Sequence, residues 1–124
     1  MPAQVVLVHD DSDFNVAATL ALTVADYRVA SFVDPVAAIR ALESARTVEA
    51  LVTRIRFGPD KPDGFALART ARRMRSDIRV LFTAQAEFAP LAVGLGEFIA
   101  APITPTDVVE GVQRLLAMND FRPC

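Results

Sequence analysis

Short runs of apolar, mostly β-branched residues alternate along the chain with longer segments of helical periodicity, and this alternation restricts the fold more than any other feature. Runs without a polar–apolar alternation, such as residues 5–8, are typical of parallel strands covered on both faces. We therefore predict one α/β domain, residues 1–124, with a doubly wound parallel sheet. Its five strands are expected at residues 4–8, 27–32, 48–53, 78–83 and 97–101.

The polar residues of the second predicted strand, Arg28 and Ser31, favour a place at the edge of the sheet. The flavodoxin-like strand order 2-1-3-4-5 puts that strand at an edge and makes the first and third strands neighbours. In such sheets, ligands bind at the carboxyl ends of the strands where the order reverses. We therefore expect the functional site where the first and third strands end.

A helix is predicted after each strand. The one after the fourth strand should be short or irregular, because Pro90 interrupts it. Asp13 or Ser12 is expected to cap the first helix, and Thr104 or Thr106 the last. The helices are expected at about residues 12–26, 35–44, 63–75, within 84–96, and 105–118.

Each longer helix carries an apolar stripe that we expect to face the sheet. These stripes are Phe14, Ala17, Leu20, Ala21 and Val24; Val36, Ile39, Ala41 and Leu42; Phe65, Leu67, Ala68, Ala71 and Met74; and Val108, Val109, Val112, Leu115 and Leu116.

Composition excludes several classes of protein. Apolar residues make up 52% of the chain, which is typical of a compact globular domain. Thirteen basic and 15 acidic residues leave a net charge of −2, which gives no general reason to expect binding to nucleic acid or membrane. The single cysteine, Cys124, cannot form an internal disulfide, and the N-terminus lacks the features of a signal peptide. We expect a cytoplasmic protein.

Four segments, taken in order and spacing, resemble the receiver domain of two-component response regulators over essentially the whole chain. They are VVLVHDDSDF at the first strand, LVTRIRFGPDKPDGF at the third, VLFTA at the fourth and FIAAPITPTDVVEGVQRLL at the end. The resemblance implies the flavodoxin-like fold and a role in bacterial two-component signal transduction.

The resemblance also shows what this chain lacks. In the family, two acids after the first strand and a phosphoacceptor Asp on the third bind Mg²⁺, and a Lys neutralises the phosphoryl group. Here His9 stands at the first acid position, Asp10 is retained at the second, Arg54 replaces the acceptor, and Ala101 replaces the Lys. Asp11 occupies a position that usually faces the loop and is a poor substitute.

Three other family positions are retained: Pro102 beside Ala101, Thr83 as the hydroxyl that contacts a phosphoryl oxygen, and Phe98 as the aromatic residue of the fifth strand. Phosphorylation nevertheless needs a carboxylate nucleophile and a hard cation held by oxygen ligands. A guanidinium stays protonated and cannot serve as the nucleophile. We therefore expect a degenerate phosphorylation site with no catalytic residue, no metal and no cofactor.

Arg54 also suggests what replaces this chemistry. An unpaired, partly buried carboxylate is unfavourable, and a guanidinium can supply the opposite charge and a forked hydrogen bond. Our hypothesis is that Arg54 pairs with Asp10, and with Asp11 as a further option. The alternative is that Arg54 points into solvent, because exposed ion pairs are often weak.

Other residues have a functional and a structural interpretation. His9 is either a metal ligand or proton switch, or only a polar neighbour of the site. The basic residues Arg69, Arg72, Arg73 and Arg75 either bind phosphates or form a solvated helix face. Phe88, if exposed beside Phe98, would contribute to a surface for partners.

The resulting hypothesis is an atypical, phosphorylation-independent receiver that acts as a protein-interaction module and not as an enzyme. Its partner would be a histidine kinase, a phosphotransfer protein or another regulator, with a homodimer as a further option. Two alternatives remain open. One is phosphorylation at a non-standard carboxylate, such as the loop residues Asp60 or Asp63; the other is a small-anion-binding module at the Arg54 cleft.

Overall fold

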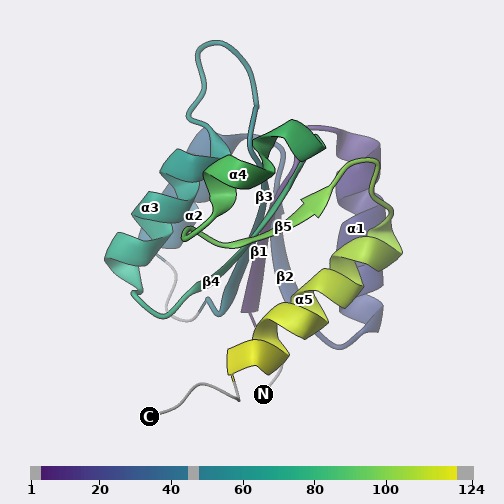
Figure 1. Cartoon of the computed structure of the whole chain (residues 1–124). Coiled ribbons are helices and arrows are strands. Elements are labelled where there is room, and N and C mark those ends of the chain that lie inside the picture. Colours follow the sequence, from purple (N-terminus) through teal and green to yellow (C-terminus); the bar gives the residue numbers. More distant parts are fainter. Residues whose placement is uncertain (1–3, 45–47, 120–124) are drawn as a thin grey trace.

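The computed structural model describes residues 4–44 and 48–119, so Cys124 lies outside the described residues. Their strands form one five-stranded sheet of order β2-β1-β3-β4-β5, in which every neighbouring pair is parallel. This confirms the predicted topology, and β2 is indeed an edge strand (Figure 1). The strands are β1 (Gln4–Val8), β2 (Arg28–Phe32), β3 (Ala50–Arg54), β4 (Arg79–Ala84) and β5 (Glu97–Ala100).

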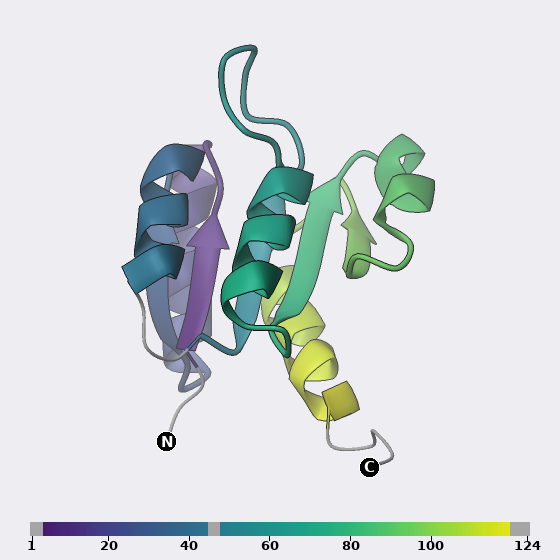
Figure 2. The ribbon, with the colours of Figure 1, turned by 90° about the vertical axis from the view of Figure 1, so that its left-hand side faces the viewer.

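Helices cover both faces of the sheet. One face carries α1 and α5 and the other carries α2 and α3, with the short α4 beside β5 (Figures 1 and 2). The fourth helix is irregular as predicted, a 3-10 turn at Ala86–Phe88 that runs into a single α-helical turn. The helices are α1 (Ser12–Val24), α2 (Pro35–Ser44), α3 (Gly64–Met74), α4 (Ala89–Ala92) and α5 (Pro105–Asn119).

The apolar side chains of the strands belong to two cores, one on each face of the sheet, and in β1 the assignment alternates along the strand. In β1, Val5 and Leu7 pack toward α1 and α5, whereas Val6 and Val8 pack toward α2 and α3. All four are at most 1% exposed. The uninterrupted apolar runs of the sequence therefore follow from burial on both faces of the sheet.

The predicted inward face of α1 was partly wrong, although Phe14 does pack against the core on the α1–α5 side. Leu20 is 63% exposed and Val24 is 78% exposed, whereas Ala18 and Leu22 are fully buried. The physical reason is that apolar residues occur all round this helix, so that its periodicity does not single out one face.

Two further core assignments were wrong, since Val36 is 38% exposed and Met74 is 48% exposed. The third strand also begins two residues later than predicted, at Ala50, and ends at Arg54, which places that arginine within the sheet. The remaining members of the α3 and α5 stripes are buried or half-buried, as predicted.

The helix caps were partly predicted. Asp11, one residue before the expected Ser12 or Asp13, caps α1 by accepting a hydrogen bond from the backbone N–H of Phe14. At α5, the Thr104 hydroxyl accepts from the N–H of Asp107, whose carboxylate accepts from the N–H of Thr104. This reciprocal pair is a capping box and confirms Thr104 over Thr106.

Candidate functional site

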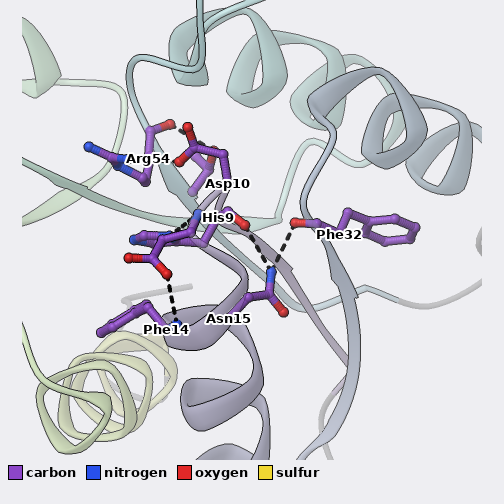
Figure 3. Close-up of polar contacts among 8 residues, drawn as sticks. His9, Asp10, Phe14, Asn15, Phe32 and Arg54 are labelled. Carbon is purple, nitrogen blue, oxygen red and sulfur yellow. Dashed lines mark hydrogen bonds and ion pairs between the residues drawn. The ribbon is translucent and has the colours of Figure 1, made fainter.

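The carboxyl ends of β1, β3 and β4 meet at one edge of the sheet. Val8, the last residue of β1, lies beside Thr53, and Arg54 lies beside Thr83 of β4. His9 and Asp10 follow β1 directly, so the strand register brings them toward Arg54 (Figure 3). The long loop 55–63 projects beyond this edge (Figures 1 and 2).

Arg54 forms an ion pair with Asp10. Its Nη1 donates to Oδ1 of Asp10 over 2.7 Å, and the two side chains are 31% and 36% exposed (Figure 3). The predicted pairing therefore occurs, and the solvent-directed alternative does not. Partial exposure limits its contribution to stability to about 1 kcal/mol or less, because water screens the two charges.

Asp11 is engaged elsewhere. Its carboxylate accepts from the backbone N–H of Phe14, and its own N–H donates to Nδ1 of His9 over 3.2 Å. The ion pairs found among the described residues do not include one between Arg54 and Asp11, so that part of the hypothesis is wrong. The cap holds the Asp11 carboxylate at the start of α1.

His9 is a buried, neutral imidazole. It is 8% exposed and its ring centroid lies 4.5 Å from that of Phe14. Burial and then the positive charge of Arg54 lower its pKa below the usual 6.5, although Asp10 and Asp11 act in the opposite direction. Because Nδ1 accepts a hydrogen bond, the single proton of the neutral ring lies on Nε2.

Asn15 is a residue of this region that sequence reasoning missed. Its buried amide Nδ2 donates to the carbonyl oxygens of His9, over 3.1 Å, and of Phe32, over 3.0 Å (Figure 3). It thereby ties α1 to the ends of β1 and β2. The available signal was one amide residue, at the fourth position of a mostly apolar helix, four residues after the cap.

The structure brings most of the predicted site residues to one small hollow of about 260 Å³. Thr83 is 2% exposed and contributes its side chain from β4, beside Arg54 from β3. The Ala101–Pro102 peptide, which is cis, closes the opposite side. The lining residues are His9, Asp11, Phe14, Arg54, Thr83, Ala84, Ala101, Pro102 and Ile103.

A larger open cleft of about 850 Å³ lies on the other side of the Arg54–Asp10 pair, between loop 55–63 and α4. Basic groups line it together with apolar side chains. The Arg56 guanidinium carbon lies 5.6 Å from the ring centroid of the half-buried Phe88. Phe98 is also half-buried, against the core on the α2–α3 side, so neither aromatic residue is fully presented to a partner.

Loop 55–63 is tied back to the sheet edge through Lys61. Its Nζ donates to Oδ1 of Asp34 over 3.2 Å. The same carboxylate accepts from the N–H of Val36, and this bond, followed by Lys61, lowers the pKa of Asp34. Asp63 at the other end of the loop caps α3 by accepting from the N–H of Ala66.

The arginines of α3 do not gather into one site. Arg75 donates to the carbonyl of Leu42 over 3.0 Å, which joins the ends of α3 and α2. Arg73 contacts the Thr70 hydroxyl on its own helix. Arg69, Arg72 and Arg73 line a separate hollow with Ala68 and Leu95, away from Arg54.

The residues present do not fit a magnesium ion. Mg²⁺ requires near-octahedral oxygen ligands, normally including carboxylates. Asp10 supplies one carboxylate, and an oxygen of it already accepts a hydrogen bond from Arg54. Within residues 4–44 and 48–119 no three His, Cys, Asp or Glu side chains gather so that they could hold a metal.

The fold matches solved response regulator receivers. The chain is 26% identical to a response regulator receiver protein from Sinorhizobium medicae, with a TM-score of 0.82 over 94% of this chain and 95% of that one. A CheY-like receiver domain protein from Methanospirillum hungatei is 18% identical, with a TM-score of 0.82 over 97% and 98% of the two chains. The receiver domain of NtrX from Brucella abortus is 19% identical, with a TM-score of 0.78 over 91% and 98%.

No known family model and no curated protein matches the chain. In the described part of the chain, no helix is both long and apolar enough to cross a membrane. The likeness to solved structures shows that the chain has the receiver fold.

Proposed function

We propose that this protein is a receiver-type interaction module of two-component signalling that works in the cytoplasm without phosphorylation and without catalytic activity. The receiver fold supports the signalling role. The single observation that carries the rest is the 2.7 Å pair between Arg54 and Asp10, which places a permanent cation at the strand end expected to hold a nucleophile.

The chemistry of the site supports loss of phosphoryl transfer. Attack on a phosphoryl donor needs a nucleophile with a free lone pair, and a protonated guanidinium has none. The neighbouring His9 is buried and holds its one accepting nitrogen in a hydrogen bond to the N–H of Asp11. The family pattern offers a metal ion three carboxylates, whereas this site offers one, that of Asp10.

The partner in this proposal is a histidine kinase, a phosphotransfer protein or another regulator. The face formed by α4, β5 and α5 supports it, because α4 ends in strongly exposed apolar side chains. Leu91 is 60% exposed and Val93 is 80% exposed. Without phosphorylation, a partner can change the state of this module only by binding one conformation better than another.

The direct test is incubation of the purified protein with acetyl phosphate and Mg²⁺, followed by intact mass spectrometry. We expect no mass increase corresponding to a phosphoryl group. A stoichiometric adduct on the unmodified protein would contradict the proposal, and peptide mapping would then identify the carboxylate, with Asp60 and Asp63 as the first positions to inspect.

The matched variant is Arg54→Asp combined with Ala101→Lys, which restores the carboxylate and the cation of the family pattern. We expect it to bind Mg²⁺ more tightly than the wild-type protein, measured by calorimetry at matched ionic strength. Unchanged affinity would show that the pocket has diverged beyond these two positions.

A second candidate function is recognition of a small anion in the larger cleft. The supporting observation is that Arg54, Arg56 and Lys61 line one open cleft with only Asp10 and Asp63 as acids. Titration with inorganic phosphate should then give saturable binding that Arg56→Ala weakens and Arg69→Ala, a change outside the cleft, does not. Absence of binding would remove this candidate.

A further inference from the structure

The outer face of α1 is an apolar surface that the fold leaves uncovered. Val16, Leu20 and Val24 are 67%, 63% and 78% exposed, and they recur every four residues along the helix. Residues spaced by four form one ridge on a helix surface. A continuous exposed ridge of large aliphatic side chains is unusual on a monomer and marks a surface for another protein.

A hollow accompanies this ridge. About 510 Å³ of open space lies between α1 and α5, which pack side by side (Figure 1). The residues that line this hollow are small or apolar. The lining residues are Ala17, Leu20, Ala21, Val24, Ala25, Thr106 and Val109.

Charge restricts what can cover this face. Residues 14–25 include no charged side chain, whereas the exposed faces of the other long helices carry charges, for example Arg40, Arg69 and Glu110. A charged partner surface would lose hydration here without gaining an ion pair. The best-matched occupant is therefore a surface that is itself apolar and uncharged.

The pattern is also symmetric about its centre. Val16 and Val24 lie four residues before and after Leu20, so the ridge reads the same in both directions. In a two-fold antiparallel pair centred on Leu20, Val16 would meet the partner subunit's Val24, and Leu20 would lie beside the small residues of the facing hollow. Two-fold dimers require such a self-complementary patch, with knob and hole side by side.

From these observations we propose that α1 forms a homodimer interface, in which two copies of this chain pack their α1 helices antiparallel about Leu20. Packing of two i±4 ridges is the commonest mode of helix–helix contact in globular proteins. This interface uses α1 and the start of α5 and leaves α4 and β5 of the proposed function free, and it does not depend on phosphorylation.

The first test is sedimentation velocity of the purified wild-type chain over a concentration series. We expect a monomer–dimer equilibrium that Leu20→Glu shifts toward monomer by at least about tenfold in Kd, because it places a carboxylate at the centre of the interface. Leu91→Glu is the matched control, since Leu91 is 60% exposed on α4, and it should leave the equilibrium unchanged. Circular dichroism verifies that both variants fold.

The second test reports the geometry directly. In a Cys124→Ser background, Leu20→Cys should form a disulfide-linked dimer on mild oxidation, and Leu91→Cys should not. A mixture of Val16→Cys and Val24→Cys chains should cross-link to each other and not to themselves if the helices are antiparallel.

Three results would overturn this inference: a wild-type chain that stays monomeric throughout the series, a dimer that Leu91→Glu disrupts and Leu20→Glu does not, or cross-linking through Leu91→Cys alone. A helix of a different protein as the occupant would give the first of these results. Neither the acetyl phosphate experiment nor the Mg²⁺ titration bears on this outcome, so the two proposals fail separately.

Discussion

A guanidinium beside a single carboxylate alters the protonation of the histidine next to both. His9 is the only histidine in the chain, it is nearly buried, and its Nδ1 accepts a hydrogen bond. Arg54 adds to the effect of burial, because a nearby cation disfavours a second positive charge. The effect of the charges at the strand ends can therefore be measured through the pKa of His9.

The first prediction concerns the pKa of His9, followed through its imidazole proton resonances in NMR. We expect a pKa below 6.5 in the wild-type protein and a higher value in Arg54→Gln, because that change removes a positive neighbour. Lys61→Gln is the control, since it removes a cation that is bound to Asp34. A His9 pKa that stays the same in Arg54→Gln would mean that the guanidinium does not act on the ring.

The second prediction is the dependence of folding stability on pH. A histidine whose pKa is lowered in the folded state is protonated more readily in the unfolded chain. The contribution of His9 to folding stability is therefore fully present at pH values above its ordinary pKa of 6.5. It is lost as the pH falls from 6.5 toward the lower pKa of the folded state. Urea unfolding of the wild-type protein on either side of 6.5 should show this loss, and His9→Gln should lack that part of it.

The third prediction concerns Asn15. Asn15→Leu should lower the free energy of unfolding by about 1–3 kcal/mol, because the buried carbonyl of His9 loses the amide donor. The carbonyl of Phe32 still accepts from the N–H of His9. Thr19→Val, which removes only the 3.4 Å bond to Asn15 Oδ1, should have a clearly smaller effect in the same urea titration. Equal effects would argue against the role given to the amide.

At the scale of elements, helix ends and helix faces differ in how far local sequence determines them. The side chains of Thr104 and Asp107 each accept a hydrogen bond from the other's backbone N–H. Because the two residues are three apart in the sequence, this capping box can be recognised from the sequence alone. At α1, by contrast, three consecutive residues, Asp11, Ser12 and Asp13, could each cap the helix by residue type, and Asp11 is the one that does. The periodicity of α1 likewise does not determine its buried face, because apolar residues occur all round the helix.

The fourth prediction compares the two threonines at the start of α5. Thr104→Ala should lower the free energy of unfolding by about 1 kcal/mol, because it removes the hydroxyl that accepts from Asp107. Thr106→Ala, at an exposed position two residues on, should change it by less than about 0.5 kcal/mol. The reverse order in chemical denaturation would assign the cap to Thr106.

At the scale of the whole molecule, the alternation of strands and helices predicted the doubly wound parallel sheet, and the polar residues of the second strand favoured the flavodoxin-like order that the structure confirms. The meeting of Asp10 with Arg54 followed from that order, since adjacent parallel strands end at the same edge. Asn15 could not be predicted in the same way, because its two acceptors, just after β1 and at the end of β2, are backbone carbonyls, which residue types do not reveal.

The partial exposure of the Arg54–Asp10 pair has a consequence for how the protein responds to its surroundings. Dissolved salt reaches a contact that is about one-third exposed and weakens it, whereas the apolar layers above and below the sheet are insensitive to screening. Ionic strength therefore weakens this contact in a graded manner, as it weakens the more exposed Lys61–Asp34 pair. The pair at the ends of β1 and β3 can therefore be weakened and restored by a change of salt concentration, without any enzyme.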